Sequence, residues 1–155
     1  MERIDDTDVR ILELLQENGR IKRSRIAEEV GLSVPTVSDR MRKLSERGVL
    51  TGYTATLSPK RLHIDITAFV RVRIDGSENY PKFVKAVAEM GEVQELHSIT
   101  GEGSHILKIR TKNTTTLETL LSRLQSLAGV VGTTTSIVLS TMKETSFLPV
   151  EPMTL

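Results

Sequence analysis

The fold is decided by residues 26–50, IAEEVGLSVPTVSDRMRKLSERGVL. Ile26 and Val30 share one face of a predicted short helix, and Gly31 suits the left-handed turn that ends such a helix. Ser33 is placed to cap a second helix. Two short helices joined by a tight turn are the pattern of a helix-turn-helix, which places its second helix in the major groove of DNA.

The second predicted helix has two distinct faces. Val37, Met41 and Leu44 recur at helical spacing, so this side is expected to be buried against its neighbours. The opposite side begins with short polar side chains that could reach base edges or phosphates, and the partial positive charge of a helix N-terminus attracts phosphate. The expected DNA contacts are Ser33, Pro35, Thr36, Ser38, Asp39, Arg42 and Lys43.

The charge of the chain gives weaker support for nucleic-acid binding. Net charge is only +1 and the calculated pI is near 8.0. The charge is unevenly distributed, however, because residues 20–47 hold eight basic and four acidic side chains. The alternative interpretation is that these charges are the solvated faces of amphipathic helices. Asp39 is ambiguous, since it could accept a hydrogen bond from a cytosine amino group or repel a phosphate.

The composition indicates a cytoplasmic protein. The 155 residues include no cysteine. The chain also has no apolar run approaching the ~20 residues of a membrane span and no apolar N-terminal segment typical of a secretion signal. We therefore expect no membrane partner, and a chain of this length can form one domain or two small ones.

Residues 1–50 are predicted to form the DNA-binding domain. Asp5, Asp6 and Asp8 precede an apolar stretch at 9–15, which predicts an N-capped helix that braces the helix-turn-helix. The pattern changes after this domain, and residues 51–64 indicate an extended connector that includes a turn.

Residues 65–141 are predicted to form a second, α+β domain. Helices are expected at 80–90 and around a capping box made by Thr115 and Glu118. Strands are expected at 66–74, 93–100, 105–111 and 132–139, with a tight turn at 101–104. The order β-α-β-β-α-β is that of the ferredoxin-like fold, in which two helices cover one face of four antiparallel strands. Residues 142–155 form a tail to which the sequence assigns no role.

The other face of this predicted sheet carries no helix. We expect it to be mostly apolar, because Phe69, Ile106 and Ile137 belong to strands that alternate at period two. A bare apolar face on a protein in water is an association surface. Two copies are therefore predicted to stack sheet against sheet as a homodimer.

The chain resembles the Lrp/AsnC family of feast/famine transcriptional regulators from about residue 3 to residue 141. The matching segments are IDDTDVRILELLQENGRI, the helix-turn-helix, GVLTGYTATLSP and GVVGTTTSIVL, which follow one another in the family's order. The resemblance implies a winged-type helix-turn-helix that binds double-stranded DNA, with Val34–Glu46 as the recognition helix. It also implies a C-terminal effector domain, dimers joined through the sheets, and octamers built from dimers.

The resemblance further implies a small-molecule site around the predicted turn at 101–104. In the family, backbone N–H groups of this turn bind the carboxylate of an amino acid, and a second acidic residue suits its ammonium group. Here Ser104 stands at that acidic position and Gly103 replaces an aromatic residue, which should weaken or redirect amino-acid binding unless Glu102 compensates. The alternative is a glycine turn with no ligand. The candidate effector residues are Thr100, Gly101, Glu102, Gly103, Ser104, His105, Thr133 and Thr135.

Three other interpretations remain open. An architectural, chromatin-like protein would bind unrelated DNA sequences equally well. Some relatives with this architecture act on tetrapyrroles, so an enzyme is a second alternative. The basic helix argues against an enzyme, and no catalytic motif is present. His97 and His105 flank the predicted turn, but two histidines lack the further ligands that a stable metal site requires. We therefore expect no catalytic residue, no metal and no cofactor.

Overall fold

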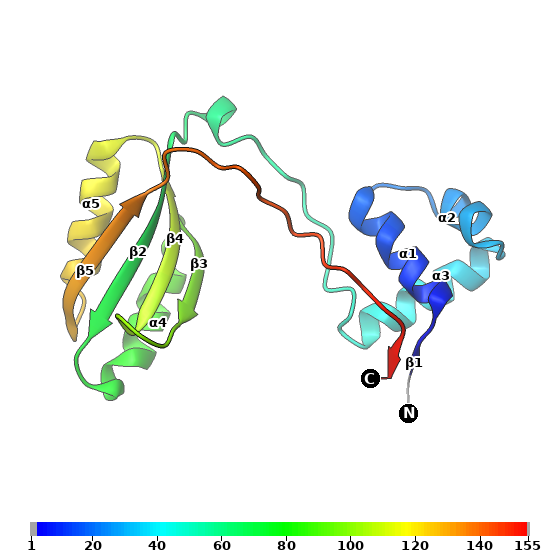
Figure 1. Cartoon of the computed structure of the whole chain (residues 1–155), viewed down its shortest axis with the longest axis horizontal. Helices are drawn as coiled ribbons and strands as arrows, with labels where there is room; N and C mark the ends of the chain where they lie inside the picture. The colour runs from blue at the N-terminus through cyan, green and yellow to red at the C-terminus, as the bar shows by residue number, and fades with distance from the viewer. Residues whose placement is uncertain (1–2, 155) are drawn as a thin grey trace. The chain divides into compact units, whose positions relative to one another are not determined.

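The computed structural model describes residues 3–154 and divides into two compact units. The first unit joins the segment up to Thr56 to the segment from Lys143 onward, and the second unit is Leu57–Met142. The chain thus leaves the first unit and returns to it, so that β1 and β6, near the two ends of the chain, belong to the same unit (Figure 1). Within the described residues, no helix is long and apolar enough to cross a membrane.

The first unit is a three-helix domain with the helix-turn-helix predicted above. Asp5 and Asp8 form a capping box at the start of its first helix. Gly31 ends the second helix in the left-handed conformation at φ 67°, and Ser33 caps the third. The elements are β1 (Arg3–Ile4), α1 (Asp6–Glu17), α2 (Arg23–Val30), α3 (Val34–Glu46) and β6 (Met153–Thr154).

The three helices share one apolar core. Ile11 of α1, Ile26 of α2 and Val37 of α3 are completely buried, and Leu44 of α3 is buried beside them. The prediction that Val37, Met41 and Leu44 turn inward is therefore confirmed. Because these positions lie on one side of α3, the helix presents its opposite side to solvent.

The C-terminal tail is part of the first unit. Its strand β6 pairs antiparallel with β1, with Ile4 opposite Met153. The Gln16 amide of α1 makes two hydrogen bonds to the backbone of Leu148: its Nε2 donates to the carbonyl at 2.9 Å, and its Oε1 accepts from the N–H at 2.7 Å. Val150 packs against the core of the unit. The tail therefore adds a strand and an apolar contact to the first unit, a role that the sequence analysis did not assign to it.

The second unit has the predicted ferredoxin-like order. Its four strands form one antiparallel sheet in the order β3-β4-β2-β5. The helices α4 and α5 lie on the same face of this sheet (Figure 1). The elements are η1 (Lys60–Leu62), β2 (Ile66–Ile74), η2 (Ser77–Asn79), α4 (Tyr80–Ala88), β3 (Val93–Ser98), β4 (His105–Thr111), α5 (Thr114–Gln125) and β5 (Val130–Ile137).

Two local predictions for this unit are wrong. The capping box of α5 is made by Asn113 and Thr116 rather than by Thr115 and Glu118, because Asn113 adopts the extended cap conformation and accepts from the Thr116 N–H at 3.0 Å. The last strand begins at Val130, two residues before the predicted start, because the pairing with β2 continues past a bulge between Arg73 and Ile74 and joins Val130 to Ile74.

The two faces of the sheet differ sharply in chemistry. On β2, Val70 and Val72 are buried beneath the helices, whereas the alternating Phe69, Arg71 and Arg73 lie on the open face. On the neighbouring strand β4, Lys108 lies opposite Phe69 and therefore also on the open face. The expectation of a mostly apolar open face is therefore wrong. Phe69 does lie there, but most apolar residues of β2 and β4 face the helices, and Ile137 lies opposite Ala68 on the helix-facing side.

Candidate nucleic-acid interface and effector site

The start of α3 presents its polar groups outward. Ser33 and Thr36 are exposed, and the Ser33 Oγ accepts from the Thr36 N–H at 3.3 Å while the two hydroxyls lie 2.7 Å apart. Pro35, next to them, is exposed, whereas Ser38 and Asp39 are half-buried. These side chains surround the N-terminus of α3, where the helix dipole favours an anion such as a phosphate.

The charged groups further along α3 pair with one another. Arg42 lies 2.5 Å from Asp39 and 2.6 Å from Glu46, and Lys43 lies 2.8 Å from Asp39. Hydrogen bonds from Lys43 and then Arg42 lower the pKa of Asp39, so this carboxylate stays ionised. The basic groups of the helix are thus partly neutralised within the helix itself. Any anion that binds Arg42 or Lys43 must compete with these acids.

Arg40 has a different role from the other basic residues of α3. Its Nη1 donates to both carboxylate oxygens of Asp5, at 2.8 and 3.0 Å, and to Asp8 at 2.8 Å. Asp8 is only 6% exposed. Burial tends to raise the pKa of Asp5, but hydrogen bonds from the Asp8 backbone and Arg40 outweigh it, and the pKa is lowered. Arg40 therefore ties α3 to the start of α1.

The proposed effector turn is a tight glycine hairpin between β3 and β4. The N–H of Ile99 donates to the Ser104 carbonyl at 3.1 Å, and Gly101 and Gly103 adopt φ values of 91° and 93°. A Cβ at position 103 would lie 3.2 Å from the Val72 carbonyl oxygen. Glycine is therefore favoured at both positions, and Gly103 also allows the turn to approach β2 closely.

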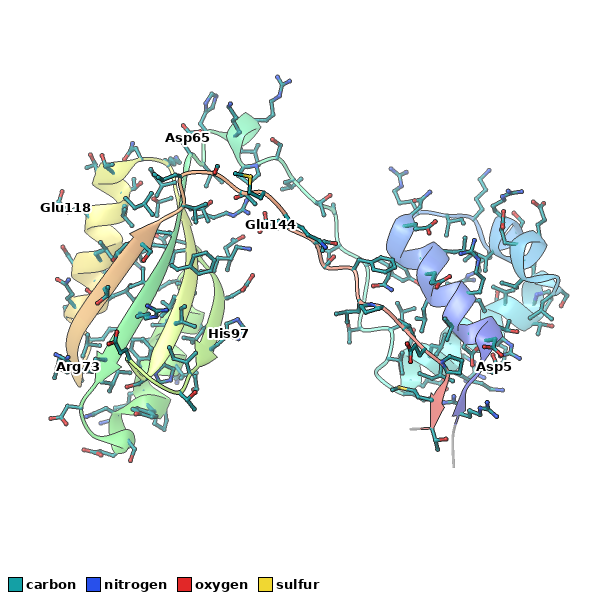
Figure 2. All side chains as sticks on the ribbon, viewed as in Figure 1. Asp5, Asp65, Arg73, His97, Glu118 and Glu144 are labelled. Carbon is teal, nitrogen blue, oxygen red and sulfur yellow. The ribbon has the colours of Figure 1, made fainter. Side chains whose placement is uncertain are left out.

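A hollow of about 590 Å³ lies between this turn and the neighbouring strands β2 and β5. Two arginines from the open face of β2 border it, and Figure 2 shows Arg73 beside β5. Thr100 and Glu102 border a second, adjacent hollow together with Arg71. The residues that line the larger hollow are Arg71, Val72, Arg73, Gly101, Glu102, Gly103, Gly132, Thr133 and Thr134.

Some of the predicted effector residues do not line either hollow. His105 is 1% exposed and packs against Tyr80 and Phe83 on the helix side, with ring centroids 5.0 and 5.1 Å away. Thr135 pairs with the buried Val70, so it lies on the helix-facing side of the sheet, like His105. Ser104 lies at the base of the turn, where its Oγ accepts from the Ile74 N–H at 3.1 Å.

Sequence reasoning overlooked the two arginines of the hollow. A signal was present, because the alternation Arg71-Val72-Arg73 in a strand places both guanidinium groups on one face.

The two histidines near the turn are not arranged as a metal site. His97 lies 3.4 Å from Glu95 on β3, whereas His105 is buried at the start of β4. In residues 3–154, no group of three or more His, Cys, Asp or Glu side chains could hold a metal ion.

Comparison with known proteins identifies both units. A family model described as the Lrp/AsnC ligand binding domain matches residues 67–148, and one described as winged helix-turn-helix DNA-binding matches residues 4–51. The chain belongs to the Lrp/AsnC family. The family predicted from the sequence motifs is thereby confirmed, as is the combination of a winged helix-turn-helix with an α+β domain.

Lrp/AsnC relatives match almost the whole chain. The HTH-type transcriptional regulator FL11 of Pyrococcus furiosus is 35% identical over 96% of this chain and 97% of its own length. The leucine-responsive regulatory protein of Salmonella typhimurium is 32% identical over 96% of this chain and 92% of its own length.

Solved Lrp/AsnC structures share the fold of this chain. A transcriptional regulator of Neisseria meningitidis, solved as a complex with L-methionine, superposes with a TM-score of 0.89 at 33% identity, covering 94% of this chain and 96% of that one. The AsnC protein of E. coli gives a TM-score of 0.87 at 28% identity, covering 93% and 97%.

Proposed function

We propose that this Lrp/AsnC protein is a sequence-specific DNA-binding regulator of transcription that acts in the cytoplasm and has no catalytic step. The observation that carries the proposal is the outward side of α3, where exposed polar groups and two basic residues lie opposite a fully buried apolar side. The proposed contacts are Ser33, Pro35, Thr36, Ser38, Asp39, Arg42 and Lys43. A helix with these properties fits the major groove of DNA.

The proposed mechanism is an exchange of ionic partners. Arg42 and Lys43 leave the intrahelical acids and neutralise DNA phosphates, which releases counterions from the duplex. Asp39 then becomes available to accept from a cytosine amino group, or it disfavours positions where a phosphate would approach it. Binding therefore gains affinity from the basic groups and selectivity from the acidic one.

The proposal extends to assembly and to control by a small molecule. Two copies, joined through their sheets, present two copies of α3 to successive turns of the major groove, and dimers combine into octamers. An effector binds around residues 100–104. The relative from Neisseria meningitidis was solved as a complex with L-methionine, which supports a small-molecule ligand. Such a ligand changes DNA binding only if it prefers one assembly over another.

The test is DNA binding by an Arg42→Ala/Lys43→Ala double variant. Removing two phosphate contacts is expected to weaken binding to a target site at least about tenfold at moderate salt and to reduce the salt slope by about two. The target site is first selected from a random duplex pool, and the affinity is then measured by fluorescence anisotropy.

The matched control is Lys60→Ala/Arg61→Ala, which removes the same charge from η1 in the second unit, where both residues are exposed. It should bind the selected site nearly as tightly as the parent. Equal losses in the two double variants would show that net charge, rather than α3, drives binding. If the parent binds all sequences equally, with a steep salt dependence, the architectural function replaces sequence-specific regulation.

A further inference from the structure

The large hollow beside the glycine turn carries an excess of positive charge. Among its lining residues, Arg71 and Arg73 are cationic and Glu102 is the one carboxylate. Within residues 3–154, no hydrogen bond or ion pair involves either guanidinium group. Two guanidinium groups held side by side at a hollow are ready partners for carboxylate or phosphate oxygens.

The same hollow offers poor recognition of an ammonium group. Ser104, at the base of the turn, has its hydroxyl 3.1 Å from the Ile74 N–H and 3.5 Å from the Ile74 carbonyl, so it is held by the backbone of β2. Its own N–H donates to the Val72 carbonyl at 2.8 Å. Glu102 is exposed at the tip of the turn. An α-ammonium group in the hollow would therefore meet two cations and one solvated carboxylate.

The geometry of β2 and β5 favours two separate anionic contacts. Arg71 and Arg73 are two residues apart on one strand, so their Cα atoms are about 7 Å apart. Arg73 lies over Gly132, where an added Cβ would come within 3.3 Å of its Nη2. Arg71 has Thr134 as its cross-strand neighbour, and the Thr134 hydroxyl adds a polar group to the same wall.

From these contacts we propose that the hollow binds a small dicarboxylate of four or five carbons, with one carboxylate at Arg71 and the other at Arg73. Each guanidinium can donate two parallel hydrogen bonds to its carboxylate, and Thr134 donates a further one. The inference rests on the proposed function, because it takes the second unit as the effector domain. It replaces an amino acid with a ligand that carries two negative charges and needs no ammonium partner.

The experiment measures direct binding of succinate and 2-oxoglutarate to the full chain by isothermal titration calorimetry, without DNA and at fixed ionic strength. L-Methionine and sodium chloride are the comparison solutes. Both dicarboxylates are expected to bind, and L-methionine is expected to bind at least about tenfold more weakly, because it offers one carboxylate and an unmatched cation. Equal or tighter binding of L-methionine would overturn the proposal, as would binding of neither dicarboxylate.

Two single variants test the assigned residues independently. Arg71→Gln and Arg73→Gln are each expected to weaken succinate binding about tenfold or more, since each loses a charge-assisted contact. Arg61→Gln removes the same charge from η1 and should bind succinate like the parent. Both arginines are exposed, so the variants should fold, and circular dichroism checks this. Unchanged binding in the two hollow variants would overturn the assignment.

The same preparation is then used in the DNA-binding assay. The two assays together distinguish failure of the proposed ligand from failure of the proposed regulatory function. A chain that binds its selected DNA site but neither dicarboxylate keeps the proposed function and loses this ligand class. A chain that binds succinate through Arg71 and Arg73 but no DNA keeps the ligand site and loses the regulator.

Discussion

Asp39 lies at the centre of the charged side chains on α3. It pairs with Arg42 and Lys43, which lie three and four positions further along the helix, so two cations share one carboxylate. Because Arg42 and Lys43 are exposed and Asp39 is only half-buried, these pairs stabilise the helix little and are screened by salt. In the proposed mechanism their effect on DNA binding is larger, because a phosphate that reaches Arg42 or Lys43 must displace Asp39.

The residue-scale prediction concerns Asp39→Asn. Loss of the carboxylate should strengthen binding to unselected DNA and steepen the dependence of log K on log salt by up to about one, because Lys43 no longer has an acidic partner. Anisotropy titrations over a salt series measure both quantities. Glu13→Gln on α1, which pairs with Arg10, makes the same charge change away from α3 and serves as the control. Weaker binding of Asp39→Asn would instead indicate that Asp39 contacts a base.

At the scale of elements, the layer between β4 and α4 contains a histidine in an apolar setting. His105 is 1% exposed, and neither ring nitrogen has a hydrogen-bond partner among the described residues. Tyr80 and Phe83 of α4 cover it. Burial lowers the pKa of His105, so the folded protein favours the neutral imidazole.

This layer should make the second unit sensitive to acid. A buried histidine with a lowered pKa stabilises the fold fully above its unfolded pKa of about 6.5, and that stability is lost as pH falls toward the folded pKa. We expect the parent to lose up to about 1.4 kcal/mol per pH unit in this range relative to His105→Leu. Denaturant unfolding at pH 7.5, 6.5 and 5.5 tests this difference. Parallel pH profiles for the two proteins would contradict it.

At the scale of the whole molecule, the two ends of the chain meet in one unit. The pairing of β1 with β6 joins Ile4 to Met153, which are 149 positions apart (153 − 4). The hydrogen bonds of Gln16 with Leu148 join residues that are 132 positions apart. The second unit is therefore inserted between two parts of the DNA-binding unit and is connected to it at both ends. Because the chain connects the two units twice, a change in the assembly of the second unit can act on the first unit through two covalent links.

The matching prediction is that removal of residues 146–155 destabilises the first unit by about 1–3 kcal/mol, since it removes two hydrogen bonds, a strand pair and the Val150 contact. Hydrogen exchange should become faster at the α1 amides, while the amides of β2 and β4 serve as an internal control. Gln16→Leu, which removes only the two Leu148 hydrogen bonds, should give a smaller change. Unchanged exchange in α1 after truncation would show that the tail does not stabilise this unit.

The open face of the sheet also bears on the proposed assembly. Its cations include Arg71 and Arg73, whereas Lys108 pairs with Glu95 at 3.2 Å. Sheet-to-sheet stacking of two copies would bring guanidinium groups toward one another, at an electrostatic cost that grows as water is excluded. A bound dicarboxylate would offset this repulsion, which links the proposed ligand to the proposed dimer.

The sequence by itself determined the features that depend on near neighbours. The buried side of α3, the cap at Ser33, the left-handed Gly31 and the order of the strands follow from residues within a few positions of one another, because helical spacing and turn chemistry are local. The pairing of Asp39 with Arg42 and Lys43 was also readable from its spacing.

Only the tertiary structure decided which distant residues meet. Arg40 counts as a basic residue of α3 in the sequence, yet its partners Asp5 and Asp8 are supplied by the start of α1. The burial of His105, the charged open face and the docking of the tail depend equally on which helix covers a strand and which strand lies beside it. These pairings are set by the packing of the whole chain, since no local pattern specifies the partner of a buried or cross-strand side chain.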